Sequence, residues 1–264
     1  MKLRRIAVST AFLCIYSFQS VHAGYSMTPL ITILEPSNKK MSDVVILKYE
    51  GDVKSPVAIE LKVMGREISV DGKVVYNKDD KSINNLVVYP AQVVLMPGDV
   101  QRVQIKWVGD TVPAREVAYG LIAAQAPVKL GDEDKERSTA QGRINILTRY
   151  EGIIVVRPKN ARPSTSVQAA GPKADEKGKT LLIITLKNSG TGLQKLQGMK
   201  LQLMPASKPG QSQSAGSYLY KPELTNEQSK HSIFAGFSRT LELPWPPQVP
   251  VGPVQATVSF DEAK

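Results

Sequence analysis

Apolar and polar residues alternate along most of this chain, and this period of two constrains the fold more than any other feature of the sequence. Between Val57 and Val63 every second residue is apolar, whereas Glu60 and Lys62 are charged. The same alternation recurs in residues 103–107, 199–203, 241–243 and 254–260. Because successive side chains of a β-strand point to opposite faces, these segments are predicted strands with one face on a core. No window of helical length keeps a period of 3.6, so the sequence predicts an all-β fold.

Turn residues and one interruption divide the strands into two domains. Asp71-Gly72 lies between two apolar runs, which is typical of a tight β-hairpin, and the regular spacing of short strands predicts β-sandwiches. Residues 159–179 are poor in large apolar side chains, and the alternation resumes beyond them. We therefore expect an N-terminal domain over 24–158 and a C-terminal β-sandwich domain over 159–264, with the boundary and linker at about 159–179.

Residues 1–23 have the three parts of a secretory signal peptide. Basic residues come first, an apolar run extends from Ile6 to Phe18, and small residues precede a cleavage site after Ala23. The run is too short to cross a bilayer core of about 30 Å at roughly 1.5 Å per residue. The sequence predicts a secreted protein that starts at Gly24 and does not insert in a membrane after cleavage.

The composition excludes several kinds of site. The chain has two histidines and one cysteine, and Cys14 and His22 fall in the signal peptide, so His231 is alone in the rest. A Cys–His nucleophile, a zinc cluster, a disulfide framework and a His-ligated metal are therefore excluded, and we expect no cofactor. The net charge of +10 becomes +7 without the three basic residues of the signal peptide. Its cations are interleaved with acids and aromatics are only 6%, so no nucleic-acid partner is expected.

The sequence does not predict an enzyme. It contains no G-x-S-x-G elbow, no phosphate-binding loop and no H-E-x-x-H helix. The acidic cluster in 132–136 is interrupted by Lys135, which favours a solvated loop over a cation site. A secreted hydrolase that uses a pair of carboxylates stays open as an alternative.

Residues 143–158 are the longest strand-like segment. Residues 153–156 are apolar on both faces and are predicted to be buried, whereas in the first half Ile144 and Ile146 lie on one face beside the charged segment 128–141. That arrangement favours the edge of a sheet, where another chain can pair. An ordinary buried strand is the alternative that the pattern leaves open.

Several segments, in order, match a known family. They are 89–98 with 101–105, 112–119, 144–158 and 186–190. Together they resemble segments of the periplasmic chaperones of the chaperone–usher pathway. In that family the corresponding segments are a strand hairpin, the start of a later strand, the long last strand of the first domain (G1) and a strand end of the second domain. The resemblance covers 27–158 well and 159–264 thinly, and the pair Arg149-Tyr150 resembles the alternate or archaic branches.

The resemblance implies two Ig-like β-sandwich domains joined at an angle, in the periplasm. It implies binding of fimbrial or pilus subunits by donor-strand complementation, in which G1 supplies a missing strand, and delivery to an outer-membrane usher. The side chains that would enter the subunit are Ile144, Ile146, Thr148 and Tyr150. Thr148 is smaller than the family's usual residue there.

The resemblance also implies other site residues. Better-known members hold the subunit's terminal carboxylate with an Arg on the first strand and a Lys on G1; here the first strand has no cation and the G1 position is Ile153. Arg149, on the face opposite the donor side chains, and Lys48 are the candidate substitutes. The family's interdomain salt bridge corresponds to Glu116, Arg157 and Asp261, and the role that the resemblance implies for these three residues is structural.

A second class of function stays open beside the chaperone. A secreted, non-enzymatic β-sandwich could act as an adhesin or a carbohydrate-binding module, for which Trp107, Trp245 and nine tyrosines would supply contacts.

Overall fold

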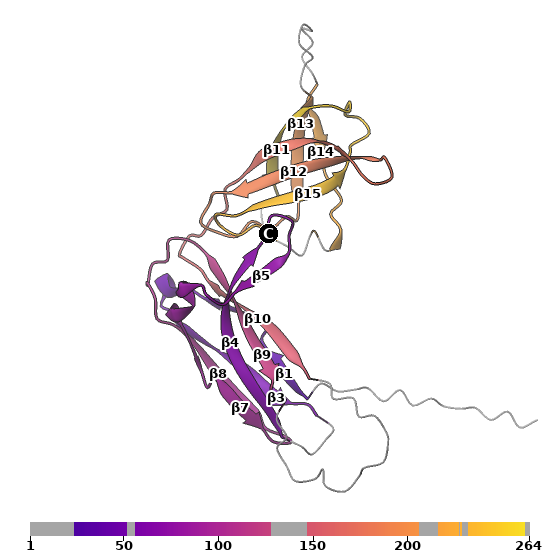
Figure 1. Cartoon of the computed structure of the whole chain (residues 1–264). Helices are drawn as coiled ribbons and strands as arrows, with labels where there is room; N and C mark the ends of the chain where they lie inside the picture. Colours follow the sequence, from indigo (N-terminus) through magenta and orange to yellow (C-terminus); the bar gives the residue numbers. More distant parts are fainter. Residues whose placement is uncertain are drawn as a thin grey trace, which may run out of the picture.

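The chain forms two β domains that follow one another along the sequence, joined by a bend (Figure 1). The structure is a computed structural model that describes residues 24–51, 56–127, 147–205, 216–226, 228 and 232–261. The predicted signal peptide, the acidic cluster in 132–136, Ile144, Ile146 and His231 lie outside these residues. The all-β prediction is confirmed, and two short 3-10 helices, η1 (Pro36–Asn38) and η2 (Lys81–Asn85), connect strands of the first domain.

Two sheets pack face to face in the first domain. One sheet has the order β1-β3-β8-β6, with β1 (Tyr25–Thr28), β3 (Ser42–Tyr49), β8 (Val100–Trp107) and β6 (Leu86–Tyr89). The other has the order β2-β10-β9-β4-β5, with β2 (Ile31–Leu34), β10 (Arg149–Val156), β9 (Val117–Gln125), β4 (Val57–Ile68), β5 (Val74–Asn77), and β7 (Gln92–Leu95) paired to β4. Alternate apolar residues of both sheets meet in one core, as the period of two predicts.

The segment around Pro97-Gly98, expected from the resemblance to be a strand hairpin, forms that pairing through β6 and β8, whereas β7 crosses to the other sheet. β7 before the turn pairs with β4, whereas β8 after it pairs with β3 and β6. The turn itself is as expected, since Gly98 has a φ of +87° and the backbone N–H of Asp99 donates to the carbonyl of Met96 at 2.9 Å. Local turn residues fix the turn but not which sheet each strand joins.

The second domain also has two sheets around its own core. One contains β11 (Thr165–Ala174), β12 (Thr180–Asn188) and β15 (Ser238–Pro244), and the other contains β14 (Tyr218–Tyr220), β13 (Met199–Pro205) and β16 (Val254–Phe260). β11 falls within 159–179, so that range is not a linker and the connection between the domains is shorter than predicted. Within the described residues β11 pairs with one strand only, and its exposed side chains do not need the apolar alternation that marks a buried strand.

A buried asparagine fixes the end of β12. Asn188 is fully buried, and its Oδ1 accepts hydrogen bonds from the N–H groups of Ser164 and Gly190, both at 3.0 Å. Its Nδ2 donates to the carbonyls of Gly192 at 2.8 Å and Ile233 at 3.0 Å. One side chain therefore satisfies backbone groups of four other residues, which holds the surrounding turns in place.

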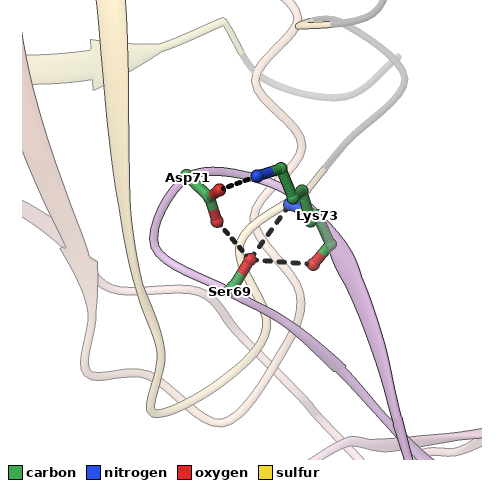
Figure 2. Close-up of polar contacts among 3 residues, drawn as sticks. All are labelled: Ser69, Asp71 and Lys73. Atoms are coloured by element: carbon green, nitrogen blue, oxygen red, sulfur yellow. Dashed lines mark hydrogen bonds and ion pairs between the residues drawn. The ribbon is translucent and has the colours of Figure 1, made fainter.

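The β4–β5 hairpin extends from the first domain to the second (Figure 1). Its turn is shown in Figure 2: Ser69 donates its hydroxyl to Asp71, and Asp71 forms an ion pair with Lys73 at 2.9 Å. At the tip, the carbonyl of Val70 accepts a hydrogen bond from the N–H of Thr240 in β15 at 2.8 Å. The predicted hairpin is thus present, and it contacts the edge of a strand in the other domain.

Further contacts between the domains lie beside this hairpin. A small apolar cluster contains Ile68 and Ala118 from the first domain and Phe234 from the second, with Ile153 packed against it. The backbone N–H of Glu116 also donates to the carbonyl of Thr191 at 2.8 Å. These contacts bring the outer face of the six-stranded sheet close to the second domain.

Candidate functional site

The candidate site is the first half of β10, where one edge of the strand has no partner among the described residues. β9 pairs with the whole of β10, from Arg149 to Val156. The parallel strand β2 pairs only with the second half, starting from Ile153 opposite Ile31. The second half is thus an interior strand, whereas residues 149–152 form an edge.

The backbone groups that face this edge belong to Arg149 and Glu151. The N–H of Ile153 donates to the carbonyl of Leu30 at 2.7 Å, on the side away from β9. Backbone groups alternate in direction along a strand, so those of Arg149 and Glu151 point the same way as those of Ile153. Those of Tyr150 and Gly152 point to β9. The edge therefore offers the donors and acceptors of two residues.

The inner face of the edge is occupied by the domain's own core. Tyr150 is half-buried, and its ring meets that of Tyr25 edge-on with centroids 5.1 Å apart. Tyr25 in turn donates its hydroxyl to the carbonyl of Ala123 at 2.6 Å, and burial raises its pKa to about 12. Tyr150, expected among the donor side chains, is thus packed in its own domain.

Thr148, the other described residue of the predicted donor set, immediately precedes β10. It is half-buried, and its carbonyl accepts a hydrogen bond from the N–H of Gln125 at 2.9 Å. The pairing with β9 therefore continues to this residue. Ile144 and Ile146 lie outside the described residues.

Exposed apolar side chains border the edge at both ends. Leu147 is 49% exposed, and at the other end Leu30 and Ile31 are 47% and 58% exposed. Gly152 lies where the chain between β1 and β2 crosses closely, because a Cβ there would lie 3.3 Å from the carbonyl oxygen of Leu30. An unpaired strand edge flanked by apolar surface suits the addition of a strand from another chain.

The outer face of the same stretch is charged. Arg149 forms an ion pair with Glu151 at 3.0 Å, and the hydroxyl of Tyr76 donates to the other oxygen of Glu151 at 3.0 Å. Burial and the hydrogen bond to Glu151 raise the pKa of Tyr76. Ile153 follows on this face and packs towards Phe234 of the second domain.

Lys48 lies elsewhere. It is in β3, opposite Ser26 of β1, and so belongs to the four-stranded sheet. Its neighbours Leu47 and Tyr49 point into the core, so Lys48 points outward from that sheet and forms an ion pair with Glu50 at 3.1 Å. The two sheets pack through their inner faces, so Lys48 and Arg149 are on opposite outer faces of the sandwich. The structure does not bring the two candidate anchors together.

Of the three expected salt-bridge residues, two are in contact. The Nε of Arg157 lies 2.8 Å from Oε2 of Glu116, whose side chain is buried while its other oxygen has no hydrogen-bond partner. Asp261 does not join them and forms an ion pair with Lys200 of β13. Glu116 and Arg157 both belong to the first domain and meet at its end, beside the contact with Thr191.

Sequence patterns missed Arg66. It stands on the outer face of β4, opposite Tyr76, and its guanidinium lies over the ring of Phe234, 5.8 Å from the centroid. With Glu116 and Phe237 it lines a cavity of about 360 Å³ between the domains, and its Nε is buried without a hydrogen-bond partner. The alternation along β4 predicts that Arg66 points outward. It cannot predict the contact with Phe234, because that residue is far away in the sequence.

The described residues give no sign of two other kinds of site. They contain no cluster of three or more His, Cys, Asp or Glu side chains that could hold a metal ion. Within the same part of the chain, no helix combines the length and apolar character needed to cross a bilayer.

Solved structures with a similar fold were found by comparison. A structure described as "Chaperone-tip adhesin complex is vital for synergistic activation of CFA/I fimbriae biogenesis" aligns at a TM-score of 0.50 and 15% identity, over 89% of this chain and 98% of that chain. The class 5 fimbriae chaperone CfaA aligns at 0.50 and 14% identity, over 89% and 100%. No protein-family model and no curated protein sequence matches the chain. At these identities the comparison establishes architecture: the chain has the two-domain, Ig-like β fold of the fimbrial chaperone CfaA.

Proposed function

We propose that this protein is a periplasmic chaperone that binds fimbrial or pilus subunits by donor-strand complementation and delivers them to an outer-membrane usher. The segment that ends in β10 would supply the strand that a subunit lacks. The subunit would in turn pair with the edge formed by Arg149 and Glu151.

The observation that carries this proposal is the half-paired state of β10. A strand that is interior at one end and open at the other, beside exposed Leu30, Ile31 and Leu147, favours the addition of a strand to this edge. The fold shared with fimbrial chaperones and the resemblance of 144–158 to G1 support the same role.

The donor side chains are Ile144 and Ile146, with Thr148 as a weaker third. On a strand that continued back from Thr148, their even positions would put them on the side that Thr148 and Tyr150 share. Two isoleucines buried in a subunit would each contribute about 1.5–3 kcal/mol of binding free energy. Because Tyr150 already packs against Tyr25, it would position the donor segment rather than enter the subunit.

The test is a double substitution, Ile144→Asp with Ile146→Asp, in the full mature chain. We expect affinity for the cognate subunit, measured by co-purification and titration, to fall about 100-fold or more. The melting temperature should change by less than about 2 °C, since the changes leave the domain's own core intact. A matched control replaces two exposed apolar residues of the second domain, Leu219→Asp with Val251→Asp, and should keep subunit binding.

The opposite result would show that the proposal is wrong. If the double variant of Ile144 and Ile146 melts many degrees lower while it still captures the subunit, these residues are ordinary core. Recovery of the protein from the cell surface rather than from a periplasmic extract would favour an adhesin instead.

For the carboxylate anchor we propose Arg149 ahead of Lys48. Arg149 lies on the edge where the subunit would pair, whereas Lys48 projects from the other sheet. Arg149→Ala should weaken subunit binding, and Lys48→Ala should not. Unchanged affinity of the Arg149→Ala variant would remove it as the anchor.

A further inference from the structure

We infer that Arg149 and Glu151 select the docked strand by its charges, favouring one that presents an acidic residue opposite Arg149 and a basic residue opposite Glu151. This inference rests on the proposed function and adds a specificity to it. The ligand it names is an extended segment with two opposite charges, two positions apart, on its outward face.

The same two residues supply both the backbone and the charges of the edge. Their N–H and C=O groups point away from β9, so a docked strand would pair with them directly. Their side chains stand on the outer face at 52% and 44% exposure, where the side chains of a paired strand would lie beside them. Register and charge recognition are therefore coupled at Arg149 and Glu151.

The neighbouring strand β9 offers these two side chains no charged partner. The residues of β9 opposite Arg149 and Glu151 are Ala124 and Ile122, neither of which carries a charge. The two side chains pair with each other along the strand, and cross-strand neighbours of opposite charge stabilise a sheet while like charges destabilise it. A docked strand is the neighbour that can supply this cross-strand charge.

Tyr76 holds the acidic half of the pair in position. Its hydroxyl donates to Oε2 of Glu151 at 3.0 Å, while Arg149 approaches Oε1 at the same distance. The ring of Tyr76 is itself held against β9, because a Cβ on Gly120 would lie 2.4 Å from its Cε1. Glu151 is therefore fixed by two partners before a strand arrives, which lowers the entropic cost of recognition.

The test compares two synthetic peptides of the same composition. Both are extended, with apolar residues at alternate positions and an amidated C-terminus, which removes the terminal carboxylate that an anchor would bind. One carries Asp two positions before Lys on the outward face, and the other carries Lys two positions before Asp. Affinities are measured by titration against the mature protein and its variants.

We expect the wild-type protein to prefer one peptide by about threefold to tenfold, from roughly twofold to fivefold per charge pair. The charge-swapped variant, Arg149→Glu with Glu151→Arg, should prefer the other peptide. As a matched control, the swap Glu60→Lys with Lys62→Glu exchanges an ion pair on the same face of the sheet, in β4, and should leave the preference unchanged.

Other outcomes overturn the inference in distinguishable ways. If both peptides bind equally, or if the charge swap leaves the preference as it was, Arg149 and Glu151 do not select charge, and the proposed function stands. Peptides N-methylated at the ladder positions should lose binding. If they bind as well as the parents, the edge does not dock a strand through its backbone, and both the inference and the proposed function fail. If neither parent binds, the inference fails, and the proposed function is decided by the double variant of Ile144 and Ile146.

Discussion

At the scale of single residues, the polar side chains of Asn188 and Asp71 fix local structure that their neighbours in sequence could not fix alone. Asn188 ends a strand and precedes two glycines, so the sequence predicts a turn there but gives no sign of complete burial. Its four hydrogen bonds reach Ser164 and Ile233, which are distant in sequence. Only the tertiary structure brings those partners together.

Asn188→Ala should therefore be strongly destabilising. It leaves buried backbone groups of Ser164, Gly190 and their neighbours without partners, which should lower the free energy of unfolding by about 2–4 kcal/mol. Urea denaturation measures this. The adjacent control, Ser189→Ala, removes one exposed hydrogen bond at 3.2 Å and should change it by less than about 0.5 kcal/mol. Equal effects of the two variants would contradict the role of Asn188.

The turn of the β4–β5 hairpin should lose stability at low pH. The hydroxyl of Ser69, followed by the ammonium of Lys73, lowers the pKa of Asp71 from 3.8 to about 2. A carboxyl with a depressed pKa in the folded state stabilises that state above its unfolded pKa and stops doing so as the pH falls through its folded pKa. The contribution should be present above about pH 4 and lost towards pH 2. A carbon-detected NMR titration that gives Asp71 an ordinary pKa near 4 would contradict it.

At the scale of elements, alternation predicted those strands that have one face on a core, and it did not predict how they combine. β4, β8, β13, β15 and β16 were found from their period of two. β11 was missed because an edge strand with exposed side chains carries no such period. The crossing of β7 and β8 to different sheets depends on distant partners, which local turn residues do not report.

The β4–β5 hairpin should hold the domains together through its tip. Gly72 has a φ of +88°, and a Cβ there would lie 3.2 Å from Nη2 of Arg239 in the second domain. Gly72→Val should therefore displace the tip and speed amide hydrogen exchange at Thr240, because the N–H of Thr240 donates to the carbonyl of Val70. Gly98→Val is the matched control, since Gly98 has a φ of +87° but no atom within 4 Å of its Cβ position. Equal exchange rates at Thr240 in both variants would show that the hairpin tip does not hold the two domains together.

At the scale of the whole molecule, the sequence predicted two domains and a candidate edge but not the joint between them. The joint is formed by Glu116, Arg66 and Phe234, which no local pattern connects. For the same reason, local sequence patterns indicated the strand of the candidate site but not where its edge is open. The change from an open edge to an interior strand at Ile153 depends on where β2 starts beside β10.

The ion pair between Glu116 and Arg157 should be needed for folding and not for the choice of subunit. Arg157→Ala leaves a buried carboxylate without a partner and should cost about 3 kcal/mol of unfolding free energy. Adding Glu116→Gln to that variant removes the buried charge and should restore part of the loss. Chemical denaturation of the single and double variants measures this, and an additive or larger loss in the double variant would contradict it.

The central claim is that residues 149–152 form an open edge that a fimbrial subunit closes, and amide hydrogen exchange tests it residue by residue. In the free protein the amides of Tyr150 and Gly152, which face β9, should be protected, and those of Arg149 and Glu151 should exchange fast. Binding of the subunit should protect Arg149 and Glu151 and leave the other two unchanged. Protection of Arg149 and Glu151 already in the free protein, or no change at them when the subunit binds, would contradict the account.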